Sequence, residues 1–316
     1  MLKYLIIPLA NDAVSFCHYN IIKTSNSQSI SIDLLKNAII WAMKRDLSIQ
    51  FLYPTHILPN DVKELIETAC HVKIVPSNTD DIELHTVADI VVFDCWQELD
   101  IYKFLPQQSC IIRTTYSELL NNKQHLCLAL TKYNRINVVI TDIEWCNDGY
   151  EDFLHDIIPY IIKEYELQHP VQLNILTDRL SLKEMNNCNA GYESLTLAPN
   201  GDFYICPAFW LDNVPAIGNL EKGIDLKNPQ LFKLSHAPIC RQCDAWQCKR
   251  CVWLNRKLTR EVNTPSHEQC ITSHIERNAS QQLLAEFHKR YPSFLPDIQI
   301  TEIDYLDPFD KIINNR

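Results

Sequence analysis

The spacing of the cysteines constrains the fold of this chain more than any other feature of its sequence. Seven of the thirteen cysteines in the 316 residues lie between Cys188 and Cys270. Thiols at this density, in a chain whose first residues do not resemble an export signal, are more often metal ligands than halves of disulfides. We therefore expect the segment to fold around iron or zinc. Its cysteines are Cys188, Cys206, Cys240, Cys243, Cys248, Cys251 and Cys270.

Net charge and apolar patterning argue against two classes of partner. The chain carries 29 basic and 39 acidic residues, a net charge of −10, which argues against a general nucleic-acid-binding protein. The apolar run in residues 1–10 is short and broken by Pro8, which favours a first β-strand over a signal peptide. No apolar stretch approaches the roughly 20 residues needed to cross a bilayer. We expect a cytoplasmic protein that binds neither nucleic acid nor membrane.

Residues 1–180 alternate between short apolar runs and amphipathic stretches, which is typical of parallel strands connected by helices. The stretch 31–45 predicts a helix, because Ser31 is a suitable cap and basic residues lie at its end. No glycine precedes Gly149, so no glycine-rich turn can bind a phosphate there, which excludes a dinucleotide fold or a P-loop. Further helices are predicted at 59–69 and 150–165, and strands at 3–8, 48–53, 71–75, 89–94, 109–113, 136–141 and 171–176.

The pattern of the sequence changes after about residue 180. Residues 195–206 predict a β-hairpin with Asn200-Gly201 as its turn, since this pair tolerates positive φ. Residues 272–289 predict a closing helix. We therefore expect an α/β layer or barrel over 1–180, a small cysteine-rich domain over 181–272, and a C-terminal helix and tail over 273–316.

Cysteine spacing also bears on the choice between iron–sulfur and zinc. A zinc ribbon needs two Cys-x-x-Cys pairs roughly 12–20 residues apart, so that both reach one ion. Only four residues separate Cys243 from Cys248, which is closer to the tight runs that bind a cubane cluster. Seven thiols also exceed one zinc tetrahedron, whereas two clusters take up to about eight ligands. The residues favour one or two [4Fe-4S] clusters, and zinc stays an alternative.

The complete pattern is Cys-x12-Gly-x4-Cys, then Cys-x2-Cys-x4-Cys-x2-Cys, then a distant Cys. It resembles the SPASM domain of radical S-adenosylmethionine (SAM) peptide maturases, although the family usually has one residue more in each of the last two gaps of the four-cysteine run. Residues 199–207 and 217–220 are similar to that family's hairpin and the segment after it. The resemblance implies an auxiliary [4Fe-4S] cluster on Cys240, Cys243, Cys248 and Cys270, and another on Cys188, Cys206 and Cys251 that lacks a fourth cysteine.

Radical SAM enzymes bind their SAM-cleaving cluster with Cys-x3-Cys-x2-Cys after the first strand, and this motif is degenerate here. The matching positions are Ala13, Cys17 and Asn20, so one thiol remains. The Gly-Gly-Glu-like segment that contacts the cofactor's amine is replaced by residues 53–56. The resemblance therefore implies a degenerate, partial (β/α)6-type radical-SAM-like barrel, and SAM is not expected as a cofactor.

Within this family the chain most resembles the CXXX repeat peptide maturase group, through residues 15–19 and 49–54. The resemblance implies a role in ribosomal-peptide maturation, in which the chain binds, presents or helps to modify a precursor peptide. A peptide with Cys-x-x-x repeats and a complete radical SAM enzyme are the implied partners. Two alternatives stay open: a zinc-stapled interaction module, and a peptide-modifying enzyme with a non-standard SAM site.

Four polar residues follow or end predicted strands, where a barrel places its functional residues. An arginine there would bind a carboxylate, and paired acids would do acid–base work. The simpler interpretation is that these are solvated loop residues or helix caps. The four are Asp94, Arg113, Asp142 and Glu144.

Overall fold

The computed structural model describes residues 2–21, 28–103, 105, 108–145, 149–180, 182, 187–246, 248 and 251–291. Within these residues nine strands form one mostly parallel sheet in the order β7-β6-β5-β4-β3-β2-β1-β8-β9. The predicted α/β class is therefore confirmed. The strands are β1 (Tyr4–Pro8), β2 (Ser48–Leu52), β3 (His71–Pro76), β4 (Ile90–Phe93), β5 (Ser109–Thr114), β6 (Arg135–Ile140), β7 (Gln172–Leu173), β8 (Ser194–Leu197) and β9 (Phe203–Tyr204), with a separate pair of β10 (Gly218–Asn219) and β11 (Gly223–Ile224).

The chain divides into two compact units. Unit 1 contains Met1–Phe93, Lys103–Ile111 and Cys188–Lys233, and unit 2 contains Asp94–Tyr102, Ile112–Asn187 and Leu234–Arg316. The cysteine segment is shared between them: Cys188 and Cys206 belong to unit 1, and the other five cysteines belong to unit 2. The predicted domain boundaries at residues 180 and 272 stay predictions.

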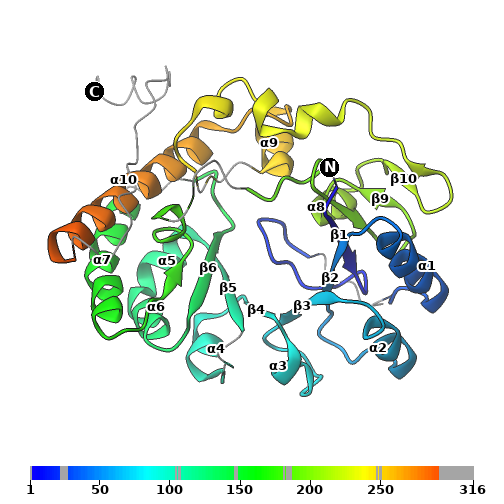
Figure 1. Cartoon of the computed structure of the whole chain (residues 1–316), viewed down its shortest axis with the longest axis horizontal. Helices are drawn as coiled ribbons and strands as arrows, with labels where there is room; N and C mark the ends of the chain where they lie inside the picture. The colour runs from blue at the N-terminus through cyan, green and yellow to red at the C-terminus, as the bar shows by residue number, and fades with distance from the viewer. Residues whose placement is uncertain are drawn as a thin grey trace. The chain divides into compact units, whose positions relative to one another are not determined.

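Unit 1 is built around β1, whose run of apolar residues is buried after Tyr4, as expected for a strand with parallel neighbours on both sides. Helix α1 (Ile32–Met43) begins where the sequence predicts it, because Ser31 Oγ accepts a hydrogen bond from the Leu34 amide at 3.3 Å. Figure 1 shows α1 and α2 (Asn60–Ile66) on the outer side of β1, β2 and β3.

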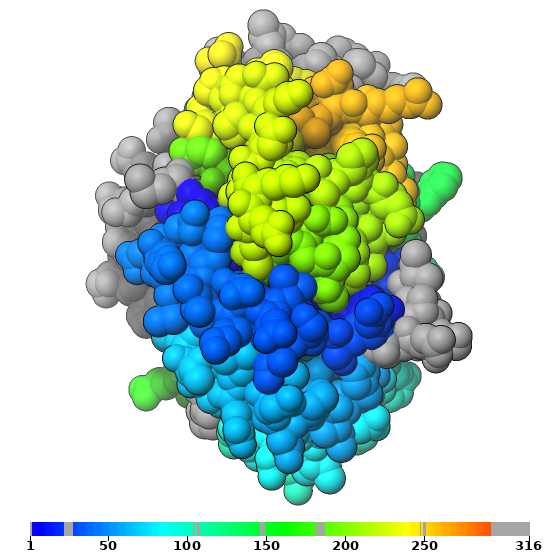
Figure 2. Space-filling view, turned by 90° about the vertical axis from the view of Figure 1, so that its right-hand side faces the viewer, coloured from blue at the N-terminus to red at the C-terminus, as the bar shows by residue number. Residues whose placement is uncertain are grey.

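The predicted hairpin is confirmed as β8 and β9. Gly201 has a φ of +88°, and Asn200 Oδ1 accepts a hydrogen bond from the Asp202 amide at 3.1 Å, so Asn200-Gly201 forms the turn. The hairpin extends the main sheet, because β8 pairs in parallel with β1. Trp41 of α1 packs on Phe203 with ring centroids 4.8 Å apart. In Figure 2 the green-to-yellow surface of this segment lies directly against the blue surface of the N-terminal segment.

Unit 2 contains two long helices that pack against each other. Helix α7 (Tyr150–Glu166) matches the prediction, and its Tyr165 ring lies 4.8 Å from that of Phe287 on α10. Helix α10 (His267–Arg290) begins before the predicted residue 272, because Ser266 and Gln269 form a capping box. Cys270 therefore lies on this helix.

The sequence analysis did not single out the remaining helices. None of the described helices is long and apolar enough to span a membrane. The remaining helices are α3 (Leu84–Val87), α4 (Trp96–Ile101), α5 (Tyr116–Asn121), α6 (Lys123–Leu130), α8 (Pro207–Leu211) and α9 (Val252–Thr259).

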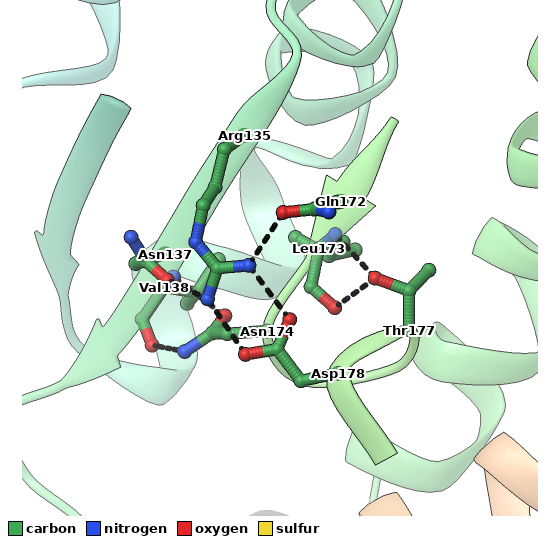
Figure 3. Close-up of polar contacts among 8 residues, drawn as sticks. All are labelled: Arg135, Asn137, Val138, Gln172, Leu173, Asn174, Thr177 and Asp178. Atoms are coloured by element: carbon green, nitrogen blue, oxygen red, sulfur yellow. Dashed lines mark hydrogen bonds and ion pairs between the residues drawn. The ribbon is translucent and has the colours of Figure 1, made fainter. Parts of the chain in front are cut away.

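The strand predicted at 171–176 is reduced to the two residues of β7, and Figure 3 shows the reason. The Asn174 side chain takes the place of ladder hydrogen bonds: its Oδ1 accepts from the Val138 amide at 2.8 Å, and its Nδ2 donates to the Val138 carbonyl at 3.0 Å. The Thr177 hydroxyl then accepts from the Leu173 amide at 2.7 Å and donates to the Leu173 carbonyl at 3.1 Å. These side-chain bonds end the strand and turn the chain back.

An ion pair fixes the direction of the chain after this turn. Arg135 of β6 donates to both carboxylate oxygens of Asp178, at 2.9 and 2.7 Å. Asp178 begins the short 3-10 helix Asp178–Leu180, and the next residue, Arg179, is buried in unit 2. The turn therefore delivers an arginine side chain to the interior.

Candidate metal centres

Strand pairing brings Cys188 and Cys206 together in unit 1. In the antiparallel pair of β8 and β9, Thr196 lies opposite Tyr204. Cys206 lies two residues after β9, at the N-cap position of α8. Ser194 Oγ donates to the backbone carbonyl of Cys188 at 3.3 Å. This bond holds the Cys188 backbone beside β8, whose partner β9 leads into Cys206.

A third thiol of unit 1 lies near this pair. Burial raises the pKa of the Cys206 thiol, and the neighbouring thiols of Cys188 and Cys17 raise it further. Cys17 is half-buried in the loop after β1, whereas Ala13 is buried and Asn20 is exposed. Sequence spacing could not predict this proximity, because the fold alone brings the loop after β1 close to Cys206.

In unit 2 the predicted ligands lie along one face of α10. His274 Nε2 is 3.6 Å from Cys243 Sγ, and Ser273 Oγ donates to Cys248 Sγ at 3.7 Å. Cys270 lies one helical turn before His274, so the two side chains share a face of the helix. The structure thus gathers three of the four predicted ligands of the second cluster around α10.

The other two predicted ligands in unit 2, Cys240 and Cys251, lie at the starts of short helices. Cys240 begins the 3-10 helix Cys240–Gln242, and its carbonyl accepts a hydrogen bond from the Cys243 amide at 3.1 Å. Cys251 occupies the N-cap position of α9. Cys243 Sγ also accepts a hydrogen bond from the Ala245 amide at 3.4 Å.

His274 is a candidate ligand that the sequence analysis missed. It is buried, and its Nε2 lies 3.6 Å from Cys243 Sγ. The available signal was the Cys270-x3-His274 spacing on a predicted helix, since residues four apart lie on one helical face. Cysteine and histidine at such short spacings are common metal ligands.

Asp244 anchors the cysteine run to the interior of unit 2. Its Oδ1 accepts from Arg277 Nη1 at 2.7 Å, and Arg179 Nη2 lies 3.8 Å from Oδ2. Arg179 also donates to the Asp244 carbonyl, and its guanidinium lies 5.3 Å from the Trp246 ring. Asp244 and Arg179 are only 1% and 2% exposed, so this is a buried ion pair directly beside Cys243.

Chemically, the donors of both units suit a thiophilic metal. Cysteine sulfur binds zinc and iron–sulfur clusters, and a backbone N–H bond to a ligand sulfur is a common feature of cluster sites. Among the residues that the structure describes, no group of three or more His, Cys, Asp or Glu side chains is already arranged to hold a metal ion. Donor type, burial and the Ala245 bond to Cys243 fit such a centre.

The four polar strand-end residues form two pairs in unit 2. Arg113 is buried at the end of β5 and donates to the exposed Asp94 at 2.7 Å. Asp142 follows β6 and accepts from the Tyr116 amide at 2.8 Å. Burial raises the pKa of Asp142, and the nearby Glu144 carboxylate raises it further. Glu144 Oε2 is buried and has no hydrogen-bond partner within the described residues.

No family model and no curated protein matches this chain. Solved structures do match its fold. Native anSMEcpe with bound AdoMet and the Kp18Cys peptide is 14% identical over 92% of this chain and 100% of that chain, with a TM-score of 0.61. The complex with the Cp18Cys peptide is 12% identical over the same shares, with a TM-score of 0.58. Histidine-tagged anSMEcpe with bound AdoMet is 13% identical over 90% and 98%, also at 0.58.

At these identities the likeness concerns the fold alone. The alignments cover at least 90% of this chain and at least 98% of the anSMEcpe chains. The chain has a radical-SAM-like α/β fold.

Proposed function

We propose that this chain is an iron–sulfur protein of a ribosomal-peptide maturation system, which binds and presents a precursor peptide or helps to modify it. The observation that carries the proposal is the grouping of thiols in unit 2, where Cys243 and Cys248 contact the helix α10 that carries Cys270. Their SPASM-like spacing supports the same conclusion. The peptide complexes of anSMEcpe, on a similar fold, support peptide binding.

The ligands would be divided between the units. In unit 2, Cys240, Cys243, Cys248 and Cys270 would hold a [4Fe-4S] cluster, and in unit 1 Cys188 and Cys206 would provide ligands for another. Cys251 stays a predicted ligand. A bound cluster would supply electron transfer or a thiolate-accepting iron. The chain itself supplies burial, sulfur ligands and the Ala245 N–H bond that lowers the charge density on Cys243.

We infer that the chain does not cleave SAM by itself. The usual cluster needs three thiolates, and two of the three matching positions cannot supply one: Ala13 has no donor and Asn20 faces solvent. A degenerate barrel of this kind would depend on a complete radical SAM enzyme as its partner. The CXXX-group resemblance makes a peptide with Cys-x-x-x repeats the expected substrate class.

The strand-end residues of unit 2 are a reasonable place for a peptide. Arg113 is buried and paired with the exposed Asp94 carboxylate, so a peptide carboxylate would bind it by displacing Asp94. The buried oxygen of Glu144 is an acceptor that a peptide N–H would satisfy. Asp142, whose pKa is raised by burial, would then be a candidate proton donor.

Anaerobic reconstitution followed by metal and sulfide analysis tests the proposal. We expect about eight irons per chain for two [4Fe-4S] clusters, or about four for one. Binding of a synthetic Cys-x-x-x repeat peptide should exceed that of the same peptide with serine in place of cysteine. Calorimetric titration with SAM should show no binding. Oxygen-protected protein without iron or sulfide would refute the proposal.

One observation favours zinc as a second candidate. Two ligands of a tetrahedral zinc ion, with Zn–S of about 2.3 Å and Zn–N of about 2.1 Å, lie about 3.6 Å apart. That is the separation of Cys243 Sγ and His274 Nε2. With Cys270 on the same helix face and Cys248 beside Ser273, a zinc-stapled interaction module is the alternative function. One zinc per chain, without iron or sulfide, would support it.

A further inference from the structure

Three polar side chains of unit 1 lie in a line of contacts beside the carboxyl ends of β1 and β2. Ser29 Oγ lies 3.4 Å from His56 Nε2. The other ring nitrogen, His56 Nδ1, lies 3.7 Å from Asp12 Oδ2. The histidine ring therefore lies between a hydroxyl and a carboxylate, with one nitrogen toward each of them. This is the order of a serine nucleophile, its general base and the acid that orients the base.

Backbone bonds hold the serine and the acid at the end of β1. Ser29 lies opposite Ala10 in an antiparallel bridge, and the Ile30 amide donates to the Leu9 carbonyl at 2.8 Å. Asp12 comes two residues after the bridge. The bridge therefore brings the serine, from a segment distant in sequence, beside the residues that follow β1.

The histidine lies in the loop after β2, which is anchored on its other side by residues that follow β3. The carbonyl of Thr55 accepts from the Asp80 amide at 2.7 Å and from the Thr79 hydroxyl at 3.3 Å. These bonds fix the backbone directly before His56. His56 ends the segment 53–56, which replaces the Gly-Gly-Glu-like segment of radical SAM enzymes.

The three side chains are partly covered. The Asp12 side chain is 21% exposed and the His56 side chain is 34% exposed, while Ser29 is half-buried. The hydroxyl is therefore within reach of a substrate from solvent. Catalytic hydrogen bonds measure about 2.6–3.2 Å, and they are often longer in a protein without substrate and tighten when substrate binds. Both separations in this site are within about 1 Å of that range.

We propose that Ser29, His56 and Asp12 form a hydrolytic site for carboxylic esters. Ser29 is the nucleophile, His56 is the general base, and Asp12 is a positioning residue that orients the ring. The site lies where barrels place functional residues, at the carboxyl ends of strands. The inference goes beyond the proposed function and does not depend on it, since none of the three residues is a predicted metal ligand. An ester suits a half-open site better than an amide, because an alcohol leaves more readily than an amine.

The reaction would proceed in two balanced halves. Ser29 Oγ attacks the carbonyl carbon while its proton passes to His56 Nε2; the C–O bond to the alcohol then breaks, and His56 gives the proton to the departing oxygen. Water attacks the acyl group on Ser29 in the same way and releases the carboxylic acid and the free hydroxyl. Ester and water thus become acid and alcohol, with no change of oxidation state. Asp12 stabilises the imidazolium that forms in each half and does not itself take up the proton.

Labelling of the full-length wild-type protein with a fluorophosphonate probe tests the nucleophile. We expect the probe on Ser29, located by fragmentation of the tryptic peptide 24–36 in a mass spectrometer. Fragmentation separates Ser29 from Ser31, which caps α1 in the same peptide. Wild-type protein that carries no probe on Ser29 would overturn the inference.

Hydrolysis of p-nitrophenyl acetate tests the roles of the three residues. Ser29→Ala, His56→Ala and Asp12→Asn should each lower the rate by about 100-fold. Asp12→Glu keeps the carboxylate and should recover part of the rate, which a purely structural role of Asp12 would not require. Ser235→Ala is the matched control and should keep the wild-type rate, because Ser235 Oγ lies 3.3 Å from His236 Nδ1 but both are exposed neighbours in sequence.

Unchanged hydrolysis by Ser29→Ala would overturn the inference. If a variant unfolds at a lower urea concentration than wild type, the labelling of wild-type Ser29 decides, because it needs no substitution. Hydrolysis and labelling by an iron-free protein would support the inference while refuting the proposed function.

Discussion

Replacing Asp244 by asparagine tests whether the buried ion pair holds the cysteine run of unit 2 in place. Asp244 is 1% exposed, accepts from Arg277 at 2.7 Å and lies 3.8 Å from Arg179, which is 2% exposed. Asp244→Asn keeps the size of the side chain and removes its charge. Arg179 would then be a buried cation whose remaining recorded bond to this residue is to its carbonyl.

The burial of both partners decides the magnitude. An exposed ion pair contributes about 0–1 kcal/mol, because water screens it. Removing one partner of a buried pair costs about 3–5 kcal/mol, since the other charge stays desolvated and uncompensated. We expect the free energy of unfolding to fall by about 3–5 kcal/mol. Because Asp244 adjoins Cys243, we also expect weaker metal retention in unit 2.

Urea unfolding of the metal-free, reduced protein, followed by far-ultraviolet circular dichroism, measures the change. The control is Glu286→Gln, which also replaces a carboxylate by an amide. Glu286 Oε1 lies 2.6 Å from Lys289 Nζ, and the lysine side chain is 69% exposed. Glu286→Gln should leave the unfolding midpoint unchanged. A loss below about 1 kcal/mol for Asp244→Asn would refute the reasoning, because the pair would then behave as a solvated one.

Three further predictions follow from single sites. The pKa of Asp142 is raised in the folded protein, so its protonation stabilises the fold at low pH, and this contribution is lost as the pH rises. Asp142→Asn should therefore unfold at an equal or higher urea concentration than wild type at pH 7. The difference between the two proteins should vanish below about pH 3.8. Gly191→Ala should lower the free energy of unfolding by about 2–4 kcal/mol, because its Cβ would lie 2.7 Å from the Phe232 ring and the residue has a positive φ. Gly223 has a similar φ but nothing within 4 Å of such a Cβ, so Gly223→Ala should lower it by only about 1 kcal/mol in the same urea assay. His274→Ala should leave iron and sulfide unchanged but alter the paramagnetic resonance spectrum, since the 3.6 Å contact to Cys243 is lost, whereas loss of one bound zinc would make His274 a ligand.

Local sequence signals predicted most of the secondary structure. The first six predicted strands and the helix after Ser31 appear at nearly their predicted bounds, because apolar runs and a side-chain cap act within a few residues. The strand at 171–176 failed because Asn174 and Thr177 bond to backbone groups that would otherwise continue the ladder. Capping by Ser266 likewise extended the last helix beyond its apolar pattern.

The candidate sites were predictable only where ligands are close in sequence. The spacing of Cys243, Cys248 and Cys270 identified residues that the fold gathers along α10. The nearness of Cys17 to Cys206 depends on β1 pairing with β8, and no local pattern encodes that pairing. His274 was overlooked because one buried histidine on a helix is usually a core residue.

The partition of the cysteines narrows the choice of ligands for each site. Cys188 and Cys206 belong to the unit that contains the N-terminal strands, whereas the five later cysteines belong to the unit that contains α7 and α10. A metal site holds its geometry best when its ligands come from elements that pack together, because one core then fixes the positions of all of them. For unit 1 that condition leads to Cys188 and Cys206, which lie before and after the hairpin of β8 and β9. For unit 2 it leads to the face of α10. If this reasoning holds, Cys188→Ser and Cys270→Ser should each remove one set of irons and spare the other.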